Sequence, residues 1–151
     1  VGGERRDRET LMPSTRLADC ANPLAMAWVD LLAQYRAQHP GHDLVLTCTA
    51  RTAEEQWELY KKGRVLKDGA WVVDADPKTS VVTNCDGRAK KSKHNSNPSV
   101  ALDFAVVVGG KVSWDPREYA PVGALARDLG LVWGGDWQAL KDYPHLELRE
   151  D

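Results

Sequence analysis

Two histidines and one aspartate in the second half of the chain have side chains that bind metal ions. His94 precedes the loop-like run Asn-Ser-Asn-Pro-Ser, Asp103 follows nine positions later inside an apolar run, and His145 opens another apolar stretch. An unpaired carboxylate buried in such a run costs several kcal/mol, so Asp103 requires a hydrogen-bond network, a cation or a metal. Two imidazoles and one carboxylate leave the fourth position of a tetrahedral zinc ion to water, as in catalytic sites. Taken singly, each histidine is also compatible with a purely structural role.

A further carboxylate, Asp142, stands three residues before His145. A carboxylate that lies beside a metal-bound water without ligating the metal can act as a general base, because zinc lowers the pKa of that water toward about 7. The other two histidines, His39 and His42, flank a Pro-Gly pair, and we expect them to be solvated surface residues.

Composition limits the class of protein. The chain has 151 residues, of which 42% are hydrophobic and 28% charged, with a net charge of −2. This balance predicts one soluble domain spanning residues 1–151 that binds neither nucleic acid nor membrane. We also expect the protein to be a monomer. The basic run Gly87 to Lys93 is expected to be a solvated loop, with recognition of an anionic substrate as the alternative. The three cysteines lack metal-binding spacing, and we expect free, mostly buried thiols.

The N-terminal segment has no apolar core typical of a signal peptide. We expect residues 1–5 to be disordered or an addition to the natural sequence.

Hydrophobic periodicity and turn residues predict an α+β fold, with a small, mostly antiparallel sheet packed with about three helices. Thr52 and Glu55 have the spacing of a capping box, and Gly109-Gly110 suits a two-residue hairpin turn. Pro121 is expected to break or offset the start of the third helix. The expected helices cover Pro23–Gln38, Ala53–Gly63 and Pro116–Gly130; the expected strands cover Asp43–Ala50, Ser99–Val108, Lys111–Trp114, Leu131–Trp133 and His145–Leu148, with shorter β-like pieces at Trp71–Val73 and Ser80–Thr83.

Three motifs resemble those of the VanY-type zinc peptidases, which include D-Ala-D-Ala carboxypeptidases and phage endolysins and share a fold with the hedgehog signalling domain. The first is Ser92, His94, Ala101, Asp103 and Phe104, similar to the family pattern SxHxxGxAxD. The second is "DYPHLE", Asp142 to Glu147. The third is "TCTARTAEEQWELYKKGR", Thr47 to Arg64. The resemblance runs from about Arg6, with the motifs in the family's order.

The resemblance implies one zinc ion bound by His94, Asp103 and His145. It also implies that Asp142 is the catalytic base and that Arg51 stabilises the developing oxyanion. Glu147 either orients a ligand imidazole or faces solvent. The interval from His94 to Asp103 is two residues longer than in the family pattern, and we expect the loop to bulge, which preserves the metal site while altering the substrate rim.

By this resemblance the chain is expected to be a zinc-dependent peptidoglycan hydrolase that cleaves the stem peptide, in the manner of an endolysin-type L-alanyl-D-glutamate endopeptidase. A D-Ala-D-Ala carboxypeptidase of the same mechanism is the first alternative, with a lysine such as Lys90, Lys91 or Lys93 binding the terminal carboxylate. A non-catalytic zinc-containing binding module is the second. An endolysin would lie in the host cytoplasm until it reaches the cell wall; the carboxypeptidase would be exported.

Overall fold

The computed structural model describes residues 12–76 and 80–150. The expectation for residues 1–5 falls outside this part of the chain. The described elements include three α-helices and three short 3-10 turns: α2 (Asn22–Gln38), α3 (Ala53–Lys61), α4 (Pro116–Asp128), η1 (Leu17–Asp19), η2 (Lys93–Asn95) and η3 (Gly134–Asp136). None of the helices in these ranges is long and apolar enough to cross a membrane.

Local signals define the helix starts as the sequence predicts. Helix α3 begins at a capping box, in which the Thr52 hydroxyl accepts from the Glu55 N–H and the Glu55 carboxylate accepts from the Thr52 N–H. Helix α4 begins after Asp115, whose side chain accepts from the Arg117 N–H. The prediction that Pro121 breaks or offsets this helix is wrong: α4 starts at Pro116 and continues through Pro121.

The main sheet has five strands, and all its pairs are antiparallel. Its order is β1 (His42–Cys48), β4 (Ala101–Val108), β7 (His145–Leu148) and β6 (Leu131–Trp133), while β5 (Lys111–Ser113) also pairs with β4. Gly109 and Gly110 join β4 to β5 at φ values of 57° and 80°, the left-handed backbone that glycine adopts without strain. The α+β class expected from the sequence is confirmed.

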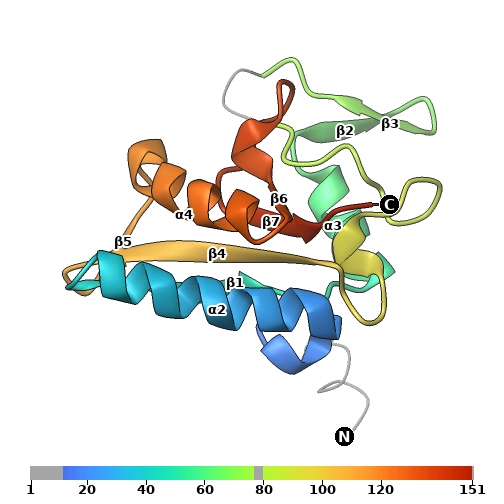
Figure 1. Cartoon of the computed structure of the whole chain (residues 1–151). Helices are drawn as coiled ribbons and strands as arrows, with labels where there is room; N and C mark the ends of the chain where they lie inside the picture. Colours follow the sequence, from blue (N-terminus) through green and yellow to red (C-terminus); the bar gives the residue numbers. More distant parts are fainter. Residues whose placement is uncertain (1–11, 77–79, 151) are drawn as a thin grey trace, which may run out of the picture.

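A second, two-stranded sheet lies with α3 at one end of the molecule (Figure 1). It is the hairpin of β2 (Arg64–Lys67) and β3 (Ala70–Val73). The structure places the expected β-like piece at Trp71–Val73 in β3, but Ser80–Thr83 forms no strand.

Alternation along the strands separates the core from the face that carries the polar residues. Leu102, Phe104 and Val106 of β4 are fully buried in the core with apolar residues of α2 and α4, and Figure 1 shows α2 lying along β4. Because successive side chains of a strand point to opposite faces, Asp103 lies on the other face of β4. The same alternation puts Leu146 in the core and His145 and Glu147 on the face of Asp103.

Packing determines the positions of one tryptophan and two histidines. Trp133 is 6% exposed in the core, and its indole donates to the Tyr143 carbonyl. His39 and His42 are half-buried rather than fully solvated, because both rings pack against the buried ring of Tyr35.

Candidate functional site

The register of the central strand brings the distant polar residues together at Asp103. On one side Asp103 is the cross-strand partner of His145 in β7, and on the other it is the partner of Cys48 in β1. Its Oδ1 lies 3.1 Å from His145 Nδ1 and 3.2 Å from His94 Nε2. Two imidazoles separated by 50 residues of sequence therefore meet at one carboxylate oxygen.

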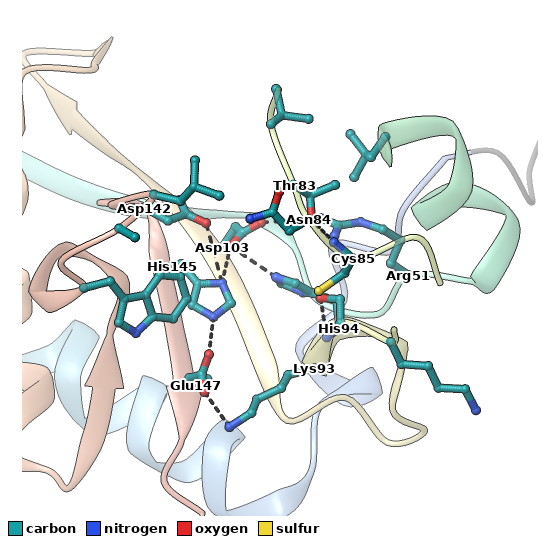
Figure 2. Close-up of a pocket in the computed structure, with 17 residues that line it drawn as sticks. Arg51, Thr83, Asn84, Cys85, Lys93, His94, Asp103, Asp142, His145 and Glu147 are labelled. Carbon is teal, nitrogen blue, oxygen red and sulfur yellow. Dashed lines mark hydrogen bonds and ion pairs between the residues drawn. The ribbon is translucent and has the colours of Figure 1, made fainter. Parts of the chain in front are cut away.

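The outer nitrogen of each imidazole is held by a second partner. His94 Nδ1 donates to the Thr49 carbonyl at 2.8 Å, and His145 Nε2 donates to Glu147 Oε1 at 2.8 Å. Each ring thus turns its remaining nitrogen toward Asp103, as Figure 2 shows. Bonds of this kind fix the ring orientation of metal-binding histidines.

Burial and mutual charge shift the pKa values of this cluster. Burial opposes ionisation of all three groups, but the hydrogen bonds and charges override it. The Asp103 carboxylate raises the pKa of His94 to about 10 and also raises the pKa of His145. The two imidazoles in turn lower the pKa of Asp103 well below its usual range. In the absence of a metal the three groups therefore form a charged cluster.

Arg51 reaches the opposite oxygen of the same carboxylate. One of its terminal nitrogens lies 3.6 Å from Asp103 Oδ2 and 3.4 Å from the sulfur of Cys48, while the other donates to Gln56 Oε1 at 2.8 Å. Gln56, fully buried on α3, also donates to the Cys85 carbonyl at 2.9 Å. Gln56 thus joins Arg51 to the segment 83–85, which also lines the pocket.

Asp142 is positioned by a close backbone approach at Gly134. The Asp142 N–H donates to the Gly134 carbonyl at 3.0 Å, and a Cβ added to Gly134 would lie 2.2 Å from the Asp142 carbonyl oxygen. Only glycine fits there. The carboxylate of Asp142 lies 3.9 Å from His145 Nδ1 and remains 46% exposed. Burial, followed by repulsion from Asp103, raises its pKa above the ordinary value.

These groups open into a pocket of about 520 Å³. Its wall combines charged side chains with apolar ones, and the Trp137 ring lies 5.0 Å from the His145 ring. The lining residues include Arg51, His94, Asp103, Asp142, His145, Val82, Asn84, Lys91, Trp137 and Leu140. A volume of this size is in the range of ligand sites.

Imidazole nitrogens and carboxylate oxygens, the donor types of this cluster, are those that bind divalent metals. Ligand atoms around tetrahedral zinc, at bond lengths of about 2.0–2.1 Å, lie about 3.3 Å from one another, and the two distances from Asp103 Oδ1 to the imidazoles are close to this value. Donor atoms of Asp103, Asp142 and His145 lie within 4.8 Å of one another, as do those of Cys48, His94 and Asp103. His94 belongs to one group and His145 to the other, and Asp103, which belongs to both, is the centre of the candidate metal site.

The structure brings together all five residues singled out from the sequence: Arg51, His94, Asp103, Asp142 and His145. Sequence reasoning missed Cys48, whose sulfur lies 3.7 Å from His94 Nδ1, and only the strand register could have located it. For Glu147 the sequence allowed two interpretations, orienting a histidine or facing solvent. The structure places its carboxylate 2.8 Å from His145 Nε2. The longer loop leaves His94 and Asp103 in contact, as expected.

Residues 86–148 match the peptidase M15 family model described as D-alanyl-D-alanine carboxypeptidase. The VanY-type resemblance is thereby confirmed.

Two curated relatives and one solved structure are similar to this chain. The peptidoglycan L-alanyl-D-glutamate endopeptidase CwlK of Bacillus subtilis (strain 168) is 36% identical over 122 residues, which cover 74% of this chain and 64% of that protein. The L-alanyl-D-glutamate peptidase of Listeria phage A118 is 37% identical over 54 residues, 32% of this chain and 18% of its own length. The chain therefore spans less than two thirds of either relative. The crystal structure of the Serratia marcescens L-Ala D-Glu endopeptidase ChiX superposes with a TM-score of 0.60 at 20% identity, over 88% of this chain and 83% of that one, which supports the fold.

Proposed function

We propose that this protein is a zinc-dependent endopeptidase that hydrolyses the bond between L-alanine and D-glutamate in the peptidoglycan stem peptide. The observation that carries the proposal is the convergence of two imidazole nitrogens on Asp103 Oδ1, with Asp142 and Arg51 beside them in one pocket. The choice of bond rests on the printed activities of the two curated relatives and of the structural neighbour.

His94 Nε2, the Asp103 carboxylate and His145 Nδ1 would hold the zinc ion. When bound, zinc supplies a Lewis acid that polarises the scissile carbonyl and lowers the pKa of water at the site. The chain provides the rest. Thr49 and Glu147 keep the imidazoles oriented, and Trp137 packs against the ring of His145.

Asp142 is the proposed general base. Its carboxylate is on the pocket wall within 3.9 Å of His145 Nδ1 and is partly exposed, so a water molecule can reach it. It would accept the proton of the attacking water and pass it to the amine of D-glutamate as the peptide bond breaks. The raised pKa of Asp142 favours this second step. A carboxyl group with a higher pKa holds a proton closer to neutral pH, so it can donate that proton to the leaving amine.

Arg51 is the proposed donor to the developing oxyanion. Its guanidinium is held by Gln56 and lies 3.6 Å from Asp103 Oδ2, whereas the two imidazoles contact Oδ1. Its Nε is buried and has no hydrogen-bond partner among the described residues. A fixed cation whose side chain is only 10% exposed stabilises negative charge that forms in the transition state.

The D-Ala-D-Ala carboxypeptidase is the second candidate, supported by the description of the matching family model. In both substrates a carboxylate adjoins the leaving nitrogen, so the same pocket would need a donor for it. Lys91 lines this pocket and is exposed, which suits such a contact. The binding-module alternative leaves Asp142 and Arg51 without a role at the metal.

Digestion of purified peptidoglycan by the zinc-loaded protein, with and without a chelator, tests the proposal. Mass spectrometry of the products should show new L-alanine carboxyl ends and D-glutamate amine ends that disappear with the chelator. Release of single D-alanine would select the carboxypeptidase instead. Intact peptidoglycan in the presence of zinc-bound protein would favour the binding module.

A further inference from the structure

Lys93, the neighbour of the candidate ligand His94, forms an ion pair with Glu147, the carboxylate that orients the other candidate ligand. Lys93 and His94 are consecutive residues of the 3-10 turn η2. The Lys93 ammonium lies 2.6 Å from Glu147 Oε2, and Glu147 Oε1 accepts from His145 Nε2 at 2.8 Å. Figure 2 shows the resulting series of contacts from Lys93 through Glu147 and His145 to Asp103.

Burial makes this ion pair different from an ordinary surface pair. The Glu147 side chain is 10% exposed and that of Lys93 is 31% exposed. A carboxylate removed from water needs a partner for each oxygen, and Glu147 has one cation or donor on each. With both oxygens engaged, the carboxylate has a single orientation, in which Oε1 faces the imidazole.

The second partner of Lys93 does not compete for this role. Glu150 Oε1 lies 3.1 Å from the ammonium, but its side chain is 80% exposed. Water screens such a pair strongly. The arrangement therefore depends on Lys93 and Glu147, and Glu150 is peripheral.

We propose that Lys93 is a positioning residue of the metal centre: its ammonium fixes the Glu147 carboxylate, which holds His145 with Nδ1 directed at the metal. The inference rests on the proposed function in that His145 is a metal ligand. As a consequence, η2 provides one ligand, His94, and through Lys93 also positions the other, His145 of β7. The orientation of the two ligands is therefore coupled. Partners in the outer shell of a metal site change metal affinity by about 10–100-fold when they are lost.

Zinc affinity, measured by competition with a chromogenic chelator, tests this inference. We expect Lys93→Met to weaken zinc binding about ten-fold, and Lys93→Arg, which retains the cation, to recover most of the loss. Lys61→Met is the matched control, because Lys61 also pairs with a glutamate, Glu58 at 2.8 Å, and is 29% exposed. It lies outside the site, and its zinc affinity should equal that of the wild type.

A double-mutant cycle separates positioning from a general structural effect. Lys93→Met added to Glu147→Gln should cause no further loss of zinc affinity, because the variant already lacks the carboxylate that Lys93 holds. Should Lys93→Met fail to fold, as judged by circular dichroism, Lys93→Gln provides the same comparison. A lower melting temperature with wild-type zinc affinity would overturn the inference, as would equal losses in both backgrounds.

The two proposals fail in different ways. Zinc-bound wild-type protein that leaves peptidoglycan intact overturns the proposed function and leaves the Lys93 comparison valid. Undiminished zinc affinity in Lys93→Met overturns the role of Lys93 even if the wild type cleaves peptidoglycan. Wild-type protein that binds no zinc overturns both.

Discussion

Asp103 and His145 are cross-strand partners in β4 and β7, and His145 Nδ1 lies 3.1 Å from Asp103 Oδ1. The contact therefore depends on strand register, since a one-residue shift of either strand would turn the polar side chain of that strand into the apolar core. The sheet that buries Leu102 and Leu146 on one face positions the polar pair on the other.

Asp103→Asn should abolish tight zinc binding. The amide keeps the shape of the side chain but lacks the charge that both imidazoles face, so we expect zinc affinity to fall by more than about 100-fold, beyond the effect of an outer-shell partner. Isothermal titration with zinc measures the change. Asp136→Asn, which removes a surface pair with Arg127 at 2.8 Å, should leave affinity unchanged. Affinity in Asp103→Asn within a few-fold of wild type would remove Asp103 from the ligand set.

Asp142→Asn should retain one zinc ion per chain and lose hydrolysis. The amide cannot accept the proton of water, and loss of a general base lowers kcat by about 10²–10⁴-fold. The rate of new amine formation on peptidoglycan, with zinc content measured by atomic absorption, checks both parts. Asp30→Asn on the exposed side of α2 is the control. Hydrolysis at the wild-type rate would rule Asp142 out as the base.

Arg51→Ala should slow turnover while zinc stays bound. Removal of one oxyanion donor costs about 10²–10³-fold in kcat. Arg51→Lys should recover only part of it, because an ammonium cannot contact Gln56 and Asp103 with two separate nitrogens. Steady-state kinetics on a defined stem peptide measure the change, with the exposed Arg36→Ala as control. A defect confined to KM would assign Arg51 to substrate binding alone.

Gly134→Ala should displace Asp142. The added methyl group would meet the Asp142 carbonyl oxygen at 2.2 Å, so the segment before β7 must shift, and overpacking of this kind costs about 1–3 kcal/mol of stability. We expect a lower kcat as well as a lower melting temperature. In Gly41→Ala no atom lies within 4 Å of the new methyl group, and only its φ of 83° is unfavourable. That variant should lose stability but keep its kcat, and an equal loss of kcat in both would contradict the explanation.

Cys85 should react with iodoacetamide before the other two thiols. Burial raises the pKa of Cys20 to about 11, so at pH 8 its thiol stays protonated, and the thiolate is the reactive form. Cys48 is also buried, whereas Cys85 is half-buried at the pocket wall. Peptide mapping after brief labelling of the native protein measures the order. Faster modification of Cys20 would indicate that α2 and its surroundings open readily.

Short-range features were predictable because they depend on the backbone and a few neighbours. The capping box at Thr52 and Glu55, the glycine turn after Val108 and the strand around Asp103 follow from local hydrogen bonds, φ preferences and the two-residue period of a strand. The same locality explains the failure at Pro121. Local rules predict a break there, but α4 packs into the core through Tyr119, Val122 and Leu125 on either side of it.

The residues of the candidate site could also be predicted from the sequence. Asp103 interrupts an apolar run, and Asp142 stands three residues before His145. Which groups touch each other was decided by the tertiary structure. Cys48 reaches His94 through the β1–β4 register, Glu147 turns to His145 rather than to solvent, and Lys93 comes to Glu147 from 54 positions away. Residue types determine what a side chain can do, whereas contacts between strands and turns distant in sequence depend on how the whole chain packs.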